Sequence, residues 1–428
     1  MSQQKVTCMA LRILKHSLLA GASLLAAACA TPGGPTANAA RIVPPATLAL
    51  HDRLLTLDTH LDTPANLVQP RGFDITERHD VNRDGSQVDL PRMKEGGLDG
   101  GFWAIYTGQG PLTPEAYRRA RDTALLRSLA IHRMAASHPD EFELALRSED
   151  AARIDRAGRK IVYQSIENSY PLGEDISMVE TFYKLGVRMI GPVHNGNNQF
   201  ADSTNDAGGP KWNGLSPLGR ELVKEANRLG IILDGSHSSD IAIEQLIDLS
   251  ATPIILSHHG ADTPHAHPRN ASDALLKKLA SRGGVIQMNA LGSFIKDLTQ
   301  SPERLAAVAA LRQKWGALDA LAPERYEAYL DERMAMDRQF PEARADFADY
   351  MEQFLYTLKL IGPDHVGVGA DWDGGGGVEG MRDISALPKI TERLLAEGYT
   401  EADLRNIWGG NVLRLLKAAE DHAAGLAR

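Results

Sequence analysis

Residues 230–260 read GIILDGSHSSDIAIEQLIDLSATPIILSHHG, and one pattern occurs twice in this stretch. Two apolar runs each lead into a Ser-His dipeptide, first Ser236-His237 and then Ser257-His258. Between them, isoleucine and leucine recur largely on one helical face, which predicts a strand, a helix and a second strand. A right-handed crossover makes the two strands parallel neighbours, so both dipeptides should lie at one edge of a sheet. Two imidazoles that meet there can bind one metal ion; in the alternative, each histidine caps its strand and bonds only to nearby backbone.

The same alternation of apolar strands and amphipathic helices extends along most of the chain. Eight strands alternating with helices predict an α/β fold, a (β/α)8 TIM-like barrel, in which the active site lies at the carboxyl ends of the strands. The alternative is an α/β sheet whose polar strand ends occur by chance. The predicted strands are one that ends at residue 62, then 100–106, 160–166, 187–193, 231–233, 253–256, 284–289 and 365–370.

The predicted barrel domain spans residues 47–422, and one segment within it does not fit a minimal barrel. Residues 296–358 are charged and helical in pattern, with Pro302 and Pro341 as expected breaks. We expect a helical insertion there, either a lid over the barrel or a dimer contact.

Residues 1–29 have the features of an export signal rather than of the fold. Basic residues precede an apolar run that ends at Cys29 and is too short to span a bilayer, which takes about 20 apolar residues. Cleavage before Cys29 would give a lipoprotein, and ordinary cleavage would fall after Ala28 or Ala39. Residues 30–46 then form a flexible lead-in. The sequence therefore predicts an exported protein, either periplasmic or anchored to a membrane by a lipid on Cys29.

The composition limits the partners and the chemistry. The chain has 428 residues, 43% of them hydrophobic, and a formal net charge of −9, which argues against a nucleic-acid surface and favours a small partner. Cys8 and Cys29 are the only cysteines, and both precede the predicted domain. A metal site in the domain must therefore use histidines and carboxylates.

Five candidate metal ligands fall at predicted strand ends, and they form a nitrogen and oxygen set suited to Zn²⁺. They are His60, Asp62, Glu167, His237 and His258. Three would suffice for one ion, whereas five suggest two zinc ions that share Glu167 as a bridge. Two zinc ions lower the pKa of a shared water and polarise a carbonyl, which is hydrolase chemistry. In the alternative, Glu167 is a buried carboxylate paired with Lys or Arg.

Three further residues have candidate roles in catalysis or substrate binding. His194 can donate a hydrogen bond to the oxyanion of a tetrahedral intermediate, or it is structural. Arg269 can hold a substrate carboxylate through two parallel hydrogen bonds, or it lies on the surface. Asp371 can bind the substrate ammonium or pass a proton to the leaving amine, or it bonds only to its own loop.

With these residues in place, the sequence resembles the membrane (renal-type) dipeptidases, which are zinc dipeptidases of the amidohydrolase-like barrels. The resemblance covers nearly all of residues 50–420. The motifs that carry it include Asp58-Thr59-His60-Leu61-Asp62, Gly100-Gly101-Phe102-Trp103-Ala104-Ile105-Tyr106, Ile166-Glu167, His194-Asn195, Ala201-Asp202, Ser257-His258, Arg269-Asn270 and Gly369-Ala370-Asp371-Trp372-Asp373-Gly374.

The resemblance implies a role for each candidate residue. His60 and Asp62 would bind one zinc ion, His237 and His258 the other, and Glu167 would bridge the two. His194 would lie near the scissile carbonyl, with Arg269 on the substrate carboxylate and Asp371 near the amino group or leaving nitrogen.

The chain departs from the family pattern at three points. The family's Asn-Phe-Tyr after the seventh strand, whose tyrosine helps to hold the substrate carboxylate, appears here as Asn289-Ala290-Leu291, so the carboxyl-side pocket should differ. The helical stretch from residue 296 is longer than in the renal-type enzymes. The family's cysteines are also absent, so a homodimer, if one forms, is not disulfide-linked through the domain.

We therefore expect an exported dipeptidase that uses a metal-bridging hydroxide on a small peptide, with no nucleic-acid partner. Two alternatives remain: a mononuclear deaminase or lactonase on the same barrel, with Asp371 activating the zinc-bound water, or a non-catalytic solute-binding lipoprotein. Between the adjacent histidines, His258 is the expected ligand and His259 is not, because neighbouring residues in a strand face opposite ways.

Overall fold

The structure, a computed structural model, describes residues 43–428 apart from 70, 317, 319 and 320. The predicted export signal, residues 1–29, and the predicted lead-in up to residue 42 lie outside the described residues. The described residues form a single compact unit, whose first helix is α1 (Pro45–His51). None of the described helices is both long enough and apolar enough to cross a membrane.

Eight parallel strands within the described chain form the barrel, which confirms the predicted fold class. Hydrogen-bonded pairing gives the orders β1-β2-β4-β5-β6 and β10-β9-β7, and each of these strand pairs is parallel. Two isolated parallel bridges close the ring, one between Asp234 and Ile255 and one between Leu61 and Trp372. The barrel strands are β1 (Leu57–Leu61), β2 (Gly100–Ile105), β4 (Lys160–Ile166), β5 (Val187–Ile190), β6 (Ile232–Leu233), β7 (Ile255–Ala261), β9 (Val285–Met288) and β10 (Val366–Val368).

Two short strands extend this ring. Strand β3 (Phe142–Leu144) pairs with β4, and β8 (Asn270–Ala271) pairs with the end of β7. The predicted crossover between the Ser-His segments is also confirmed, because the Asp234–Ile255 bridge makes β6 and β7 parallel neighbours.

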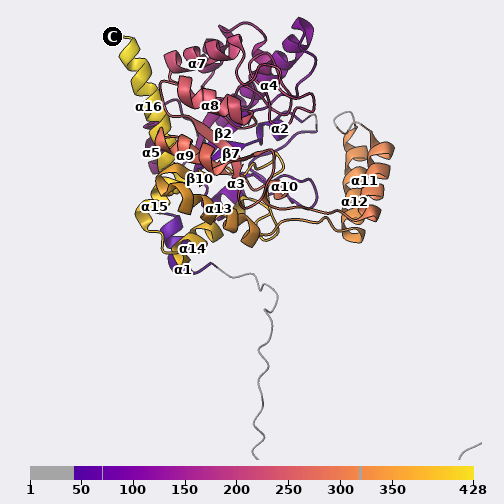
Figure 1. Cartoon of the computed structure of the whole chain (residues 1–428). Helices are drawn as coiled ribbons and strands as arrows, with labels where there is room; N and C mark the ends of the chain where they lie inside the picture. The colour runs from indigo at the N-terminus through magenta and orange to yellow at the C-terminus, as the bar shows by residue number, and fades with distance from the viewer. Residues whose placement is uncertain (1–42, 70, 317, 319–320) are drawn as a thin grey trace, which may run out of the picture. The chain divides into compact units, whose positions relative to one another are not determined.

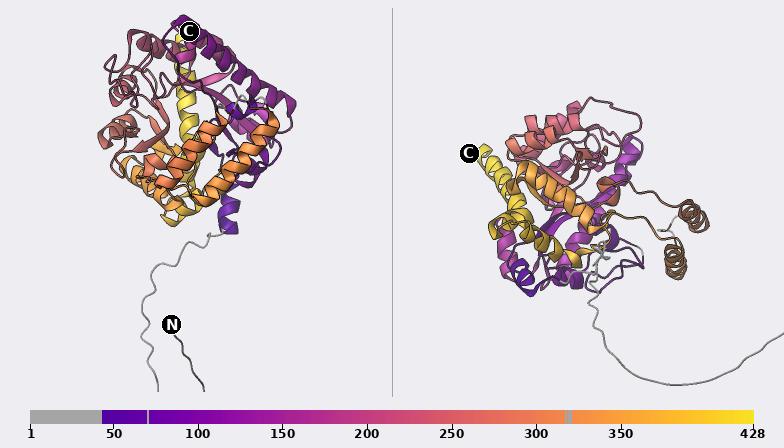
Figure 2. Two further views of the ribbon diagram at one scale, coloured as in Figure 1. Left: turned by 90° about the vertical axis from the view of Figure 1, so that its right-hand side faces the viewer. Right: turned by 60° about the horizontal axis from the view of Figure 1, so that its bottom comes forward.

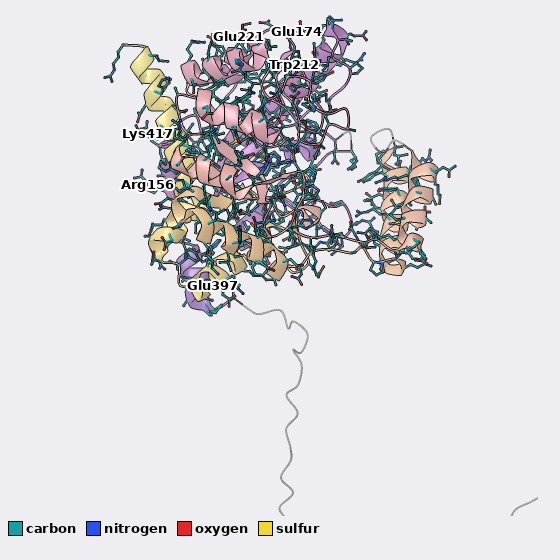
Figure 3. The ribbon with its side chains drawn as sticks, in the orientation of Figure 1. Arg156, Glu174, Trp212, Glu221, Glu397 and Lys417 are labelled. Atoms are coloured by element: carbon teal, nitrogen blue, oxygen red, sulfur yellow. The ribbon has the colours of Figure 1, made fainter. Side chains whose placement is uncertain are left out.

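The helices surround the strands, and several begin at a serine whose hydroxyl accepts a backbone N–H three residues later. Ser216, Ser239 and Ser272 do this for α7, α8 and α9. The helices around the barrel are α2 (Pro64–Leu67), α3 (Leu90–Glu95), α4 (Pro114–Ser137), α5 (Asp150–Arg156), α6 (Met178–Lys184), α7 (Pro217–Leu229), α8 (Asp240–Leu249), α9 (Asp273–Ser281), α10 (Gly292–Ile295), α13 (Phe347–Ile361), α14 (Pro388–Ala396), α15 (Glu401–Arg405) and α16 (Asn411–Leu426). Their outer faces are charged, as Glu221 on α7 and Lys417 on α16 show in Figure 3.

The two ends of the barrel differ in chemistry. At the amino-terminal end, side chains from the first residues of several strands, such as Leu57, Ile255 and Val285, form a buried apolar cluster. Val412 and Leu415 of α16 belong to the same cluster, so this helix covers that end. The polar candidate residues are therefore left to the carboxyl ends of the strands, as in other barrels of this type.

A helical hairpin, α11 (Pro302–Trp315) and α12 (Pro323–Gln339), stands away from the barrel, on the side opposite α16 (Figures 1 and 2). It follows β9 and thus leaves from the carboxyl-terminal rim of the barrel. Helix α13 packs against α9, β7 and β10. The predicted insertion, residues 296–358, thus contains a barrel helix as well as the hairpin.

Candidate metal centre and active site

One group of donor atoms lies where β1 and β10 end side by side. His60 belongs to β1, and its Nε2 lies 3.2 Å from Oδ2 of Asp62 and 3.9 Å from Oδ1 of Asp371. Asp371 follows β10 in a left-handed backbone conformation, with φ of 65°, which only a tightly determined turn holds in a residue other than glycine. The donor atoms of the three residues all lie within 4.8 Å of one another. We had expected Asp371 to act on substrate; the structure also places it close enough to share an ion with His60 and Asp62.

Glu167, which directly follows β4, lies at the centre of the site. Its Oε1 lies 3.1 Å from Nε2 of His237, 3.4 Å from that of His194, 3.7 Å from that of His258 and 3.8 Å from that of His60. Side chains from four strand ends therefore converge on one buried carboxylate oxygen. This is the position that a bridging ligand requires.

The ring nitrogens of His237 and His258 face each other at 2.8 Å, and their neighbours fix which nitrogen carries hydrogen. The hydroxyl of Ser257 donates to Oδ2 of Asp234 at 2.5 Å, so its oxygen accepts from Nδ1 of His258 at 2.9 Å. In the same way, Nδ1 of His237 donates to Oδ1 of Asn195 at 3.1 Å. Both Nε2 atoms then present lone pairs to each other and to Glu167. Such an arrangement needs a cation between them.

The electrostatics of the site also favour a bound cation. Burial, with added repulsion from Asp62, raises the pKa of Glu167 well above its ordinary value. Burial also raises the pKa of Asp371 to about 6. Burial opposes the charge of His60, but the nearby carboxylates of Asp62 and Glu167 outweigh it and raise the pKa of His60 to about 10. Buried Oδ1 of Asp62 has no hydrogen-bond partner among the described residues. The negative charge gathered at this site therefore favours protons on Glu167, Asp371 and His60, and divalent ions would supply positive charge in place of these protons.

The two facing histidines have the protonation state that metal ligands need. Burial and the charge of Arg269 hold the pKa values of His237 and His258 well below the ordinary range for histidine. Both rings are thus neutral at physiological pH, and a neutral imidazole is the form that binds a metal. The donor set of nitrogen and carboxylate oxygen suits zinc. The residues present therefore fit a metal centre.

His194 faces the same central carboxylate from the wall of a cavity of about 580 Å³. Its ring lies edge-on to Tyr106, with centroids 4.9 Å apart. Burial and the charge of Arg269 lower the pKa of His194 to about 4, so the imidazole is neutral. We had expected His194 to lie outside the metal set; its Nε2 in fact lies within 4.8 Å of donor atoms of Glu167 and His237.

Arg269 is completely buried, which excludes the alternative that it is a surface arginine. Its Nη1 lies 2.6 Å from Nδ1 of His259, and its Nη2 donates to the carbonyl of His258 at 3.1 Å. Among the described residues, its Nε has no partner. The guanidinium lies 5.4 Å from the ring of Phe294, a residue that lines the cavity. His258 and His259 thus point in opposite directions, as strand alternation predicted.

Tyr106 and Arg127 line the cavity but were not among the predicted site residues. Tyr106 directly follows β2, so its strand-end position was a usable signal. Arg127 reaches the cavity from α4, and its position on a helix gave no such signal. Asn289, which follows β9, donates to Oδ2 of Asp371 at 3.3 Å and so fixes that carboxylate.

Comparison with known proteins identifies the family. Residues 46–428 match the membrane dipeptidase family (peptidase family M19). The dipeptidase tcpJ of Claviceps purpurea is 29% identical over 359 residues, which cover 82% of this chain and 74% of that protein.

Solved structures show the same fold. The probable dipeptidase PvdM from Pseudomonas aeruginosa superposes with a TM-score of 0.74 at 29% identity, covering 88% of this chain and 98% of that one. The dipeptidase AC, a metallopeptidase of family M19, is 23% identical with a TM-score of 0.67, and the match covers 86% of this chain and 99% of that one. These matches confirm the resemblance seen in the motifs: the chain belongs to the membrane dipeptidase family, peptidase family M19, and is a hydrolase that acts on peptide bonds.

Proposed function

We propose that this protein is a zinc-dependent dipeptidase that hydrolyses the peptide bond of short peptides at a two-metal centre around Glu167. The observation that carries the proposal is the convergence of the Nε2 atoms of His237 and His258, which lie 2.8 Å apart and 3.1 and 3.7 Å from Oε1 of Glu167. His60 and Asp62, together with Asp371, form a second donor group, whose ligand atoms all lie within 4.8 Å of one another. Two donor groups that share one carboxylate favour two ions over one.

The ligand roles follow from this grouping. His60 and Asp62, with Asp371 beside them, would hold one ion, and His237 and His258 would hold the other. Glu167 would bridge the two. When bound, two zinc ions would supply a shared, activated water as the nucleophile and would polarise the scissile carbonyl.

His194 and Asp371 carry the proposed proton and charge chemistry of the protein itself. Neutral His194 can donate from Nε2 to the oxygen that becomes negative when the carbonyl is attacked. Asp371 lines the cavity beside His60, where its carboxylate can accept a proton from the nucleophile and pass it to the leaving amine. Asn289 keeps the Asp371 carboxylate oriented for this transfer.

The cavity also suits a small peptide. Its volume of about 580 Å³ lies in the usual range for small-molecule sites, about 300–1,000 Å³. We propose that the carboxyl end of the substrate lies on the side of the cavity near Arg269, whose buried Nε has no partner among the described residues.

The substitution His258→Ala tests the function. It should reduce the zinc content from about two ions per chain to one or fewer, and it should lower kcat/KM on a panel of L,L and L,D dipeptides by more than about 100-fold, because even outer ligand partners are worth about 10- to 100-fold. His422→Ala on α16, outside the site, is the matched control. Unchanged zinc in His258→Ala would contradict the proposal. Full activity with one zinc ion per chain would favour the mononuclear alternative.

We also propose that the protein is exported, on the basis of the amino-terminal sequence. The mass of the mature amino terminus distinguishes a lipid on Cys29, which would anchor the protein to a membrane, from simple cleavage after Ala28 or Ala39.

A further inference from the structure

Arg127 is a cation in the wall of the cavity without a carboxylate partner among the described residues. Its Nη1 donates to the backbone carbonyl of Tyr106, and its guanidinium lies 5.4 Å from the centre of the Tyr106 ring. Its Nε is buried and has no hydrogen-bond partner in the described chain. Burial lowers the pKa of Arg127, the expected effect on a cation that is removed from water and lacks an ion pair. Such a group is stabilised when an anion binds to it.

The charges of Asp62 and Glu167 partly offset the effect of burial on the pKa of Arg127, but no carboxylate of the described chain forms an ion pair with its guanidinium. Asp62, Glu167 and Asp371 share the cavity with Arg127, but each belongs to the donor groups that converge on the candidate ions. If bound ions neutralise these carboxylates, the positive charge of Arg127 would face the cavity without a negatively charged partner. The partner must therefore arrive with the substrate.

Arg127 and Arg269 lie on opposite sides of the barrel mouth. In the closed ring, β2 and β7 are separated by three strands in either direction. Arg127 bonds to Tyr106 at the end of β2, whereas Arg269 lies between β7 and β8. The candidate metal centre lies between them, because its ligands come from both sides of the mouth: His60 belongs to β1 and Glu167 follows β4, on either side of β2, whereas His258 belongs to β7. A dipeptide bound across the centre has one residue toward each arginine.

The direction of the substrate follows from the proposed function. With its terminal carboxylate toward Arg269, the amino group lies toward Asp371 after β10 and the amino-terminal side chain lies toward β1 and β2. We propose that Arg127 binds an acidic side chain on the amino-terminal residue of the substrate, so that the enzyme prefers Glu-X and Asp-X dipeptides. This inference rests on the proposed dipeptidase function and names the substrate class of that site.

A pair of matched substrates tests the effect of a negative charge on the amino-terminal side chain alone. Glu-Ala and Gln-Ala have nearly the same shape and differ in the carboxylate that Arg127 would bind. The zinc-loaded wild-type enzyme should have a higher kcat/KM for Glu-Ala. Arg127→Gln should reduce kcat/KM for Glu-Ala by about 10- to 100-fold, the range for a hydrogen bond to a charged group, mainly through KM, and should leave Gln-Ala nearly unchanged. Arg127→Lys, which retains the charge but not the planar fork, should keep part of the preference.

Two controls accompany this series. Arg133→Gln removes the same charge from an exposed position of α4 and should change neither substrate. The zinc content and melting temperature of Arg127→Gln should match those of the wild type, which separates a loss of recognition from a loss of fold.

The remaining outcomes overturn the inference. It is wrong if the wild type does not prefer Glu-Ala, or if Arg127→Gln slows both substrates equally. It is also wrong if Arg127→Gln instead abolishes discrimination between Glu-Ala and its carboxyl-terminal amide, because Arg127 would then bind the terminal carboxylate. If the zinc-loaded wild type cleaves no dipeptide, the proposed function fails, and the inference fails with it.

Discussion

The polar network behind the metal centre and the contacts of the α11–α12 hairpin hold their side chains in different ways. In the network, Asp234, Ser257 and His258 are at most 2% exposed and form a continuous chain of hydrogen bonds. At the hairpin, Arg83 pairs with Glu327 and Asp331, whose side chains are 57% and 69% exposed.

Side chains are held in exact positions in the buried network but not at the hairpin, and the energies of the two kinds of contact explain why. A buried hydrogen bond to a charged group contributes about 1.5–3 kcal/mol, and leaving one partner unpaired costs at least as much. Exposed ion pairs contribute little, because water and salt screen them. The network can therefore fix a ring nitrogen to one orientation, whereas the hairpin contacts fix only an approximate position.

The largest expected effect comes from breaking the buried network at Asp234. In Asp234→Asn, the side-chain oxygen should stay with the backbone N–H groups of Ser236 and Ser257, which donate to Oδ1 of Asp234 at 2.9 Å. The NH2 group then faces the Ser257 hydroxyl and cannot accept its hydrogen, so Ser257 donates to Nδ1 of His258 instead. The proton of that imidazole then moves to Nε2, the atom directed at Glu167. Zinc affinity should fall by about 10- to 100-fold, measured by competition with a chromogenic chelator.

Asp248→Asn is the matched control for this substitution. Asp248 is exposed on α8, where its carboxylate pairs with Lys278 at 2.8 Å. The same change of carboxylate to amide there should leave zinc affinity unchanged. Equal zinc affinity in Asp234→Asn and wild type would show that Ser257 does not determine the protonation of His258.

Much of the fold and of the candidate site could be predicted from the sequence, because the signals lie in short stretches of the chain. An apolar run followed by His, Asp or Glu marks a strand end, and a barrel brings all strand ends to one rim, which is why His60, Glu167 and His258 meet. Because side chains alternate between the two faces of β7, the sequence also predicted that His258 and not His259 would face the candidate metal centre. These inferences needed only the period of a strand and the topology of the fold.

What could not be predicted depends on tertiary geometry. The proximity of Asp371 to His60 results from a left-handed turn after β10, which no periodicity reveals. Arg127 reaches the cavity because of the position of α4, and the burial of Arg269 depends on the packing around β7 and Phe294. The pattern of residues 296–358 was helical throughout, so it could not show that α13 packs on the barrel while α11 and α12 do not.

A smaller effect is expected from removing the hairpin. Gln300 and Ala343 lie side by side at its base, joined by two hydrogen bonds of 3.0 and 2.9 Å. Residues 302–341 can therefore be replaced by a short Gly-Ser linker with little strain. Because none of the candidate metal ligands lies in this segment, the shortened protein should keep its zinc content and a melting temperature close to that of the wild type. The loss of either ion would show that the hairpin supports the metal centre.

The smallest effect is expected from Arg83→Ala, which removes the exposed ion pairs to Glu327 and Asp331. Other contacts between the hairpin and the loop that joins α2 to α3 remain, since Arg71 donates to the hydroxyl of Tyr326 at 3.0 Å and Arg333 donates to the backbone carbonyl of residue 83 at 2.7 Å. The hairpin should thus stay docked but open more often. Trypsin cleavage in the connection to α13, at Arg344, should be faster than in the wild type at low salt, and the two rates should converge at about 1 M salt, where the screening length is about 3 Å. Melting temperature and zinc content should not change. A lower zinc content would mean that these surface charges act on the metal centre, which would remove the distinction between the two regions.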